Sequence, residues 1–351
     1  MLLIILELSL GIVWGISLSL FIPSLIESGV VDSYGYLAFL SSISTIASYL
    51  AVGRLMDKGY RFPALSIALL GLAVVAMENS QMILATILFG IYIGAHYVTL
   101  VYIASDKTKN LLLAHSSNLL GSAIGSILVF LHLYHPALLL LSLAGLGYYG
   151  IAKTTKLEKC HNPMKARDVC LILSILGFAL GLSSLNVDYY LAMKFKDEKA
   201  IAFMFSLASL FSSIAILLST PLLSRMGTVK LHVIATIVQA LIYGSLAIAP
   251  VLMIAILLVA LGDMALILAD SALENIYARR EEQRGTMIAL AGISWEISAG
   301  FGRLLGVSLF SIAQEAPFIL SASILIFYTA FWISKSLNLG FCRDVLFNRF
   351  D

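Results

Sequence analysis

The chain has 351 residues, of which 60% are hydrophobic and only 12% are charged, and its formal net charge is +2. Soluble domains are about 45–50% apolar and about 25% charged, and a soluble chain of this length could not bury so much apolar surface in one core. Together with a mean hydropathy of +0.98, these values exclude a soluble protein. The high apolar content leads us to expect a lipid bilayer around the chain. The charges are few and scattered, so we expect no nucleic-acid partner.

Apolar runs long enough to cross a bilayer recur along the whole chain, since a helical span needs about 20 mostly apolar residues. The predicted fold class is an all-α polytopic membrane protein with twelve transmembrane helices. The first run has no basic residue before it and is too long for a signal peptide, so we interpret it as a span. We expect the spans at residues 2–25, 33–53, 63–77, 80–104, 111–131, 136–152, 169–190, 199–219, 230–248, 251–277, 286–311 and 317–336.

Basic residues concentrate in alternate loops, which indicates the orientation of the chain in the cell membrane. With both termini in the cytoplasm, the 22 Lys and Arg residues fall in cytoplasmic loops or the tail, except Lys194, Lys196, Lys199 and Arg303. The basic linker 154–168 divides two six-helix bundles, 1–153 and 169–337, and a cytoplasmic tail covers 338–351. The three cysteines, Cys160, Cys170 and Cys342, then lie on the reducing side, where we expect neither a disulfide nor a metal site.

A loop motif follows the second span of each predicted half. The first copy runs from Gly53 to Arg61 as G-R-L-M-D-K-G-Y-R, and the second from Thr220 to Thr228 as T-P-L-L-S-R-M-G-T. A turn that carries an acid and a base at the end of a span can latch onto the facing half. The alternative is an ordinary basic loop with no gating role.

The chain resembles the major facilitator superfamily of transporters over its whole length. The family signature G-x-L-x-D-[RK]-x-G-R-[RK] is matched by Gly53, Leu55, Asp57, Lys58 and Arg61, while Tyr60 and Phe62 depart from it. The second copy keeps Leu222, Arg225 and Gly227, with Ser224 in place of an acid. Drug–proton antiporters of this family usually carry an arginine in the fourth span and a Gly-Pro pair in the fifth. This chain has Gly90 in place of the arginine and Ser126 in place of the proline.

This resemblance implies two six-helix bundles that hold a small-molecule substrate near the bilayer midplane between them. It also implies a gating role for Gly53, Asp57, Lys58, Arg61, Arg225 and Gly227. Asp57 is expected at the N-terminus of the span at 286–311, where the helix dipole favours a negative charge.

Ionisable residues within the spans need a reason, because a charge at the bilayer centre costs about 2.5–3.5 kcal/mol on insertion scales. Asp263, Asp270 and Glu274 share one face of their helix, and we expect the first two in the cavity. Glu274 could instead pair at the surface with Arg279 or Arg280.

Charged residues also occur in the first span and the eleventh. Glu296 and Arg303 lie seven residues apart, about 10 Å of helical rise, which is too far for a close pair without a bridging group. They are candidates either for the cavity or for a structural network. Glu7 and Trp14 are cavity candidates too, although Glu7 could snorkel to the interface and Trp14 could be a packing residue.

Two histidines complete the set of candidate residues. Tyr92 and His96, one turn apart, predict a cavity wall with a proton relay, because histidine titrates near physiological pH. A buried neutral histidine bonded to a carbonyl is the alternative. His115, Asn118 and Ser122 form a polar face that favours helix association.

The function that these features favour is secondary transport of a small solute by alternating access, either facilitative or coupled to ions such as protons. A transporter-like sensor or scaffold is one alternative. A membrane-embedded enzyme is another, although we find no nucleophile–base or metal-ligand motif. We expect a monomer without a cofactor.

Overall fold

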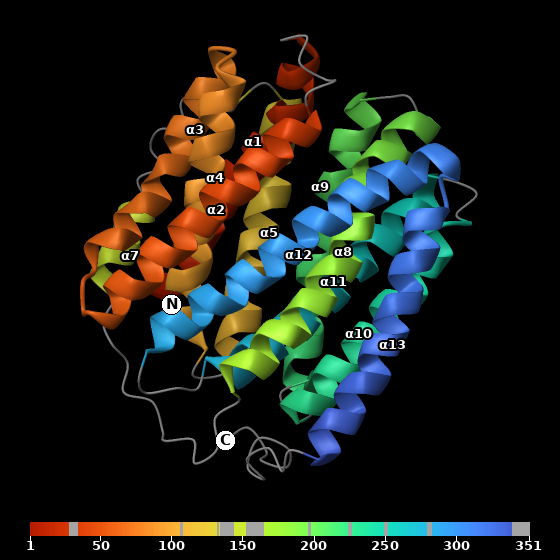
Figure 1. Cartoon of the computed structure of the whole chain (residues 1–351). Helices are drawn as coiled ribbons and strands as arrows, with labels where there is room; N and C mark the ends of the chain where they lie inside the picture. The colour runs from red at the N-terminus through yellow and green to blue at the C-terminus, as the bar shows by residue number, and fades with distance from the viewer. Residues whose placement is uncertain are drawn as a thin grey trace.

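The computed structural model describes residues 1–27, 34–105, 108–131, 133, 144–151, 165–195, 198–223, 227–248, 252–278 and 283–338, and they form helices joined by short connections. The first group, called the N-terminal helices, comprises α1 (Leu2–Glu27), α2 (Tyr34–Asp57), η2 (Phe62–Ala68), α3 (Leu69–Glu78), α4 (Met82–Ala104), α5 (Thr108–Phe130) and α7 (Ala144–Ile151). The C-terminal helices are α8 (Ala166–Phe195), α9 (Glu198–Leu223), α10 (Thr228–Leu246), α11 (Leu252–Tyr277), α12 (Arg284–Ile312) and α13 (Ala316–Asn338) (Figure 1).

The predicted all-helical membrane architecture is confirmed, and each expected span has a helical counterpart. Eight described helices are long and apolar enough to cross a bilayer: α1, α2, α4, α5, α8, α10, α11 and α13. The third span begins as a 3-10 helix with Pro63 in its first turn, where a missing backbone N–H removes no helical hydrogen bond. The sixth is described only over 144–151. The predicted bundle boundaries stay predictions, because most of the linker 154–168 and the tail after 338 lie outside the described residues.

Glycines bring two pairs of helices into close contact. A Cβ atom added to Gly15 of α1 would lie 2.0 Å from the carbonyl oxygen of Ser122 in α5. A Cβ atom added to Gly181 of α8 would lie 2.2 Å from the carbonyl oxygen of Ala299 in α12. Because the first and fifth spans of each predicted half pack in the same way, the two halves repeat a packing device as well as a loop motif.

We predict that Gly15→Ala destabilises the protein. The added methyl group overlaps backbone rather than a flexible side chain, and such overpacking costs about 1–3 kcal/mol or more. Thermal unfolding of the purified protein in detergent measures the loss. Gly300→Ala is the matched control, because nothing lies within 4 Å of a Cβ atom at Gly300. Equal melting temperatures for the two variants would contradict this account of the α1–α5 packing.

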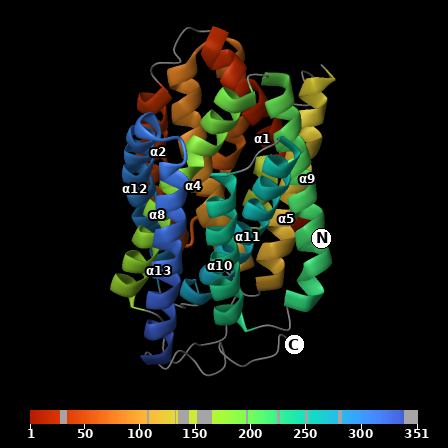
Figure 2. The same ribbon diagram turned by 90° about the vertical axis from the view of Figure 1, so that its right-hand side faces the viewer.

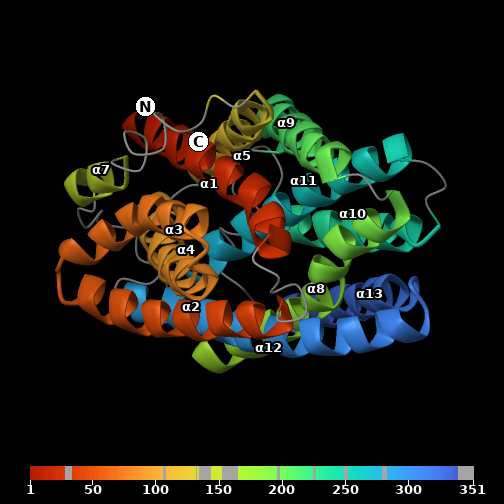
Figure 3. The same cartoon turned by 90° about the horizontal axis from the view of Figure 1, so that it is seen from above.

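The N-terminal and C-terminal helices meet along two seams. One seam joins α2 to α12 and the other joins α5 to α9, and Figure 3 shows these pairs on opposite sides of the molecule. On the C-terminal side, α10 packs between α11 and α13 (Figure 2). The seams therefore place α1, α4, α8 and α11, which carry most of the candidate residues, between them.

The turn after α2 depends on a glycine. Gly59 has a φ of +81°, a left-handed conformation that glycine adopts without steric cost. The N–H groups of Gly59 and Tyr60 donate to the carbonyls of Met56 and Leu55, at 2.9 and 3.0 Å, which closes the helix end. The turn leaves Asp57 at the last helical position, beside the start of α12.

Candidate functional site

Glu7 is the centre of a buried polar cluster in the N-terminal helices. Its side chain is fully buried, and its carboxylate accepts hydrogen bonds from Asn118 Nδ2 of α5 at 2.9 Å and from the Tyr148 hydroxyl of α7. His96 Nε2 of α4 lies 2.9 Å from the same carboxylate. The idea that Glu7 snorkels to the interface is therefore wrong, since three helices surround it with polar partners that compensate its burial.

Aromatic rings connect this cluster to the centre of the molecule. The His96 ring stacks on Tyr92 with centroids 5.3 Å apart and an angle of 11° between planes. Trp14 contacts both Tyr92 and Phe89, at centroid distances of 5.8 and 5.9 Å. The His96 side chain is 16% exposed, whereas Glu7 is inaccessible. Of the residues that bond to Glu7, His96 and Asn118 are both partly exposed, so either can connect the carboxylate to its surroundings.

The acidic residues of α11 lie apart from that cluster. Asp263 and Asp270 are partly buried, and within the described part of the chain neither carboxylate has a hydrogen bond or an ion pair. No described contact joins Asp263 to Tyr92 or His96, so the predicted grouping of these three residues is present only for the two in α4. Glu274 is 3% exposed and lies 3.5 Å from His115 Nε2 of α5.

The predicted contact between Asp57 and the start of the eleventh span is present. The two carboxylate oxygens of Asp57 accept hydrogen bonds from the backbone N–H groups of Gly285 and Thr286, each at 2.7 Å, and from the Thr286 hydroxyl at 2.5 Å. Gln283, the residue before α12, makes no side-chain cap. Asp57 of α2 therefore caps α12 from outside, where unpaired N–H groups and the helix dipole favour an anion.

Further contacts close the same end of the bundle, which we call the Asp57 end. Arg284, 3% exposed, donates to the Ser105 hydroxyl, and its guanidinium lies 5.1 Å from the centre of the Tyr102 ring. Asn275 Nδ2 donates to the carbonyl of Ser105 at 2.8 Å. The N-terminal helices α2 and α4 are thus bonded to the C-terminal helices α11 and α12 at this end.

Among the described residues, the rest of the loop motif makes no hydrogen bond to the facing helices. Gly53 packs against α12, since a Cβ atom there would lie 2.5 Å from the Gly285 carbonyl oxygen. Lys58 and Arg61 are exposed. Gly227 precedes α10 in an extended conformation, and Arg225 lies outside the described residues.

The prediction that Glu296 and Arg303 need a bridging group to pair is wrong, since they contact each other directly, although a third residue also joins them. Arg303 Nη1 donates to Glu296 Oε1 at 2.7 Å, and both side chains bond to the Ser42 hydroxyl of α2, at 2.5 and 3.1 Å. Side chains of a helix lean toward its N-terminus, so the long Arg303 side chain reaches back over two turns. The pair therefore belongs to the α2–α12 seam.

We predict that Arg303→Met lowers the free energy of unfolding by about 3 kcal/mol, because it leaves the carboxylate of Glu296 buried and uncompensated. The double variant Glu296→Gln with Arg303→Met should regain most of this loss, since neither charge remains. Thermal unfolding in detergent compares the three proteins. If the double variant is as unstable as the single one, the pair is not the source of the stability.

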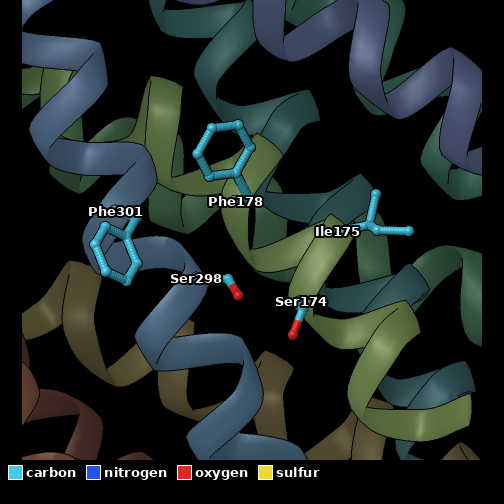
Figure 4. A pocket seen from close by; sticks show the side chains of 5 residues that line it. All are labelled: Ser174, Ile175, Phe178, Ser298 and Phe301. Carbon is cyan, nitrogen blue, oxygen red and sulfur yellow. The ribbon is translucent and has the colours of Figure 1, made fainter. Parts of the chain in front are cut away.

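A shallow surface depression of about 430 Å³ includes none of these residues in its lining. Ser174, Ile175 and Phe178 of α8 and Ser298 and Phe301 of α12 line it (Figure 4). Phe301 is 65% exposed, and the lining has no ionisable group. This depression therefore contributes nothing to the polar site.

Comparisons with known proteins identify the architecture. No family model matches the chain, and no curated protein sequence does. The solved structure of the human organic anion transporter MFSD10 matches with a TM-score of 0.74 and 15% identity, over 94% of this chain and 98% of that one. A bacterial homologue of the iron transporter ferroportin, in an outward-facing state, matches with a TM-score of 0.68 and 16% identity, over 96% and 98%.

A third match carries the family in its description. The major facilitator superfamily proton:xylose symporter XylE matches with a TM-score of 0.67 and 12% identity, over 95% of both chains. The chain has the major facilitator superfamily fold. At these identities the matches establish the fold alone, and a multi-pass membrane protein is its direct consequence.

Several polar residues in the core of the bundle are missed by sequence reasoning. Tyr148 was hidden in an apolar span, and Asn118 was assigned to helix association alone. Arg284 falls in the predicted loop before the span at 286–311, and Glu274 is expected either on the acidic face of its helix or in a surface pair. Arg279 and Arg280, the expected partners of Glu274, lie outside the described residues. In each case the sequence shows only a polar residue within or beside an apolar helix. Its bonding partner lies on another helix that is distant in sequence.

Proposed function

We propose that the chain is a secondary transporter that carries a small solute by alternating access. The observation that supports this proposal is the set of contacts at the Asp57 end. They are hydrogen bonds and a cation–π contact between two groups of helices, and such contacts can break and reform without unfolding either group. With both termini in the cytoplasm, as the basic loops predict, the closed end faces the cytoplasm.

Coupling to protons is proposed for the Glu7 cluster. The carboxylate of Glu7 and the imidazole of His96 share a hydrogen bond inside the bundle, so a proton gained or lost there changes the charge of a buried site. A change of buried charge biases the equilibrium between two conformations that hydrate the site differently. His96, which is partly exposed, would pass the proton to Glu7.

The substrate class follows from the balance of charges inside the bundle. Asp263 and Asp270 carry two acids into the bundle, whereas the cation of Arg303 is already paired with Glu296. This balance favours cationic or neutral polar solutes over anions. The matched structures are named for organic anion, iron and proton:xylose transport, so the fold by itself does not select the substrate. The protein is proposed to act as a monomer without a catalytic step.

A ligand screen by thermal shift tests the proposal. Amines, sugars, organic acids and divalent metal ions are added to the purified protein, and a true ligand raises the melting temperature. The same ligand should have no effect on Asp263→Asn and its full effect on Glu315→Gln, which removes an exposed acid outside the site. If the ligand stabilises both variants equally, Asp263 is not part of the binding site.

A further inference from the structure

One face of α5 joins the Glu7 cluster to the C-terminal helices. Asn118 donates to Glu7 at 2.9 Å, and His115, one turn earlier on the same face, lies 3.5 Å from Glu274 of α11. Glu274 belongs to the C-terminal helices and Glu7 to the N-terminal helices. A single turn of α5 therefore lies between the proposed coupling carboxylate and an ionic contact across the two groups of helices.

Carboxylates surround His115 from two sides. Glu7 on α1 and both Asp270 and Glu274 on α11 interact with it electrostatically. Of the other packed helices, α4 carries His96 and Tyr97 on the same side of the bundle, and the described side chains of α9 include no acid or base. The contact between His115 and Glu274 is an ion pair only when the imidazole carries a proton.

The His115–Glu274 pair lies beside other contacts that must break when the Asp57 end opens. In α11, Asn275 bonds to Ser105 of α4, and the Tyr277 hydroxyl bonds to the Tyr97 hydroxyl of α4. These residues occupy the last turn of α11. Movement of that turn away from α4 and α5 separates Glu274 from His115 and exposes both to water.

We propose that His115 and Glu274 form a proton-dependent lock that holds the Asp57 end closed, and that the charge of Glu7 sets the strength of this lock. The proposal rests on the alternating access proposed above. When His115 carries a proton, the pair is ionic and the closed state is favoured. When Glu7 gains a proton, His115 loses one stabilising charge, and the end opens more readily.

Distances between spin labels across the Asp57 end test the lock. The full chain is purified with Cys160, Cys170 and Cys342 replaced by serine, and labels are attached at Tyr60→Cys and Lys230→Cys, both of which are exposed. Lys230 lies at this end because His232, two residues later, bonds to Ala269 of α11. Pulsed electron paramagnetic resonance then measures the distribution of distances between the two labels, and hence the fraction of open protein. The measurement is repeated from about pH 6 to about pH 8.5, where imidazole titrates.

The open fraction of the otherwise unchanged protein is expected to rise with pH as His115 loses its proton. His115→Lys, which keeps a positive charge, should stay closed throughout, and His115→Gln should be open to a constant extent. Glu7→Gln should move the midpoint to lower pH, because it removes one of the negative charges that stabilise the imidazolium of His115. His232→Gln, a buried histidine outside the lock, should keep the original midpoint.

Two results would overturn the lock while leaving alternating access in place. One is a normal pH dependence in both His115 variants, and the other is an unchanged midpoint in Glu7→Gln. A distance that does not change with pH, although Asp57→Ala opens the end, also rejects the lock. If no variant and no pH changes the distance, alternating access itself is wrong.

Discussion

Replacing Asp57 with alanine should open the Asp57 end and raise the open population at least about tenfold. The substitution removes an external helix cap, worth about 0.5–2 kcal/mol, and hydrogen bonds to a charged group, worth about 1.5–3 kcal/mol each. A cysteine at Ala104, which is 1% exposed at this end, reports opening through its rate of reaction with a maleimide. The other cysteines are replaced by serine.

Lys58→Ala is the control for this experiment. It removes a charge from the next residue of the same turn, and Lys58 is exposed and takes no part in capping α12. Its labelling rate should equal that of the unsubstituted protein. If Asp57→Ala labels no faster than Lys58→Ala, the cap contributes nothing to the closed state, and the proposed gating role of the loop fails.

Replacing Glu7 with leucine should be the most destabilising of the changes considered, by about 3 kcal/mol or more. The apolar side chain leaves the amide of Asn118, the hydroxyl of Tyr148 and the imidazole of His96 without their shared acceptor, at about 1–3 kcal/mol for each buried group. Thermal unfolding in detergent measures the effect. Glu7→Gln should cost less, because its amide oxygen still accepts a hydrogen bond.

A second substitution shows whether the lost acceptor is the cause. In the double variant Glu7→Leu with Tyr148→Phe, one orphaned donor is gone, so the loss should be smaller than the sum of the two single losses. Strictly additive losses would mean that Tyr148 and Glu7 do not interact. A Glu7→Leu protein as stable as the original would place Glu7 in water.

The sequence alone predicts the helices well, because apolar length is a strong signal in a chain whose solvent is lipid. Even α12, which carries Glu296 and Arg303 and is not among the eight described helices that are long and apolar enough to cross a bilayer, is found from its place between loops. The contact of Asp57 with α12 is also predictable, since the loop motif and the helix dipole both indicate it. The pairing of Glu296 with Arg303 is missed because helical rise alone ignores the lean of side chains.

Contacts between distant helices are the part that the sequence does not reveal. Glu7 near the end of a span reads as a residue that can snorkel, and only Asn118 and Tyr148 from other helices make burial favourable. His115 and Glu274 likewise look like separate polar residues until α5 and α11 are packed together. Such pairs depend on which faces of two helices pack against each other, and the periodicity within one helix does not determine the packing partner.

Counterflow in liposomes tests the central claim of alternating access most directly. The protein is reconstituted with the unlabelled ligand found by thermal shift inside, and a trace of labelled ligand is added outside. A transporter exchanges one for the other, so the label accumulates transiently, and His115→Gln, which is proposed to weaken the lock, should still exchange. A ligand that binds and stabilises the protein but never accumulates would contradict transport and favour a membrane sensor.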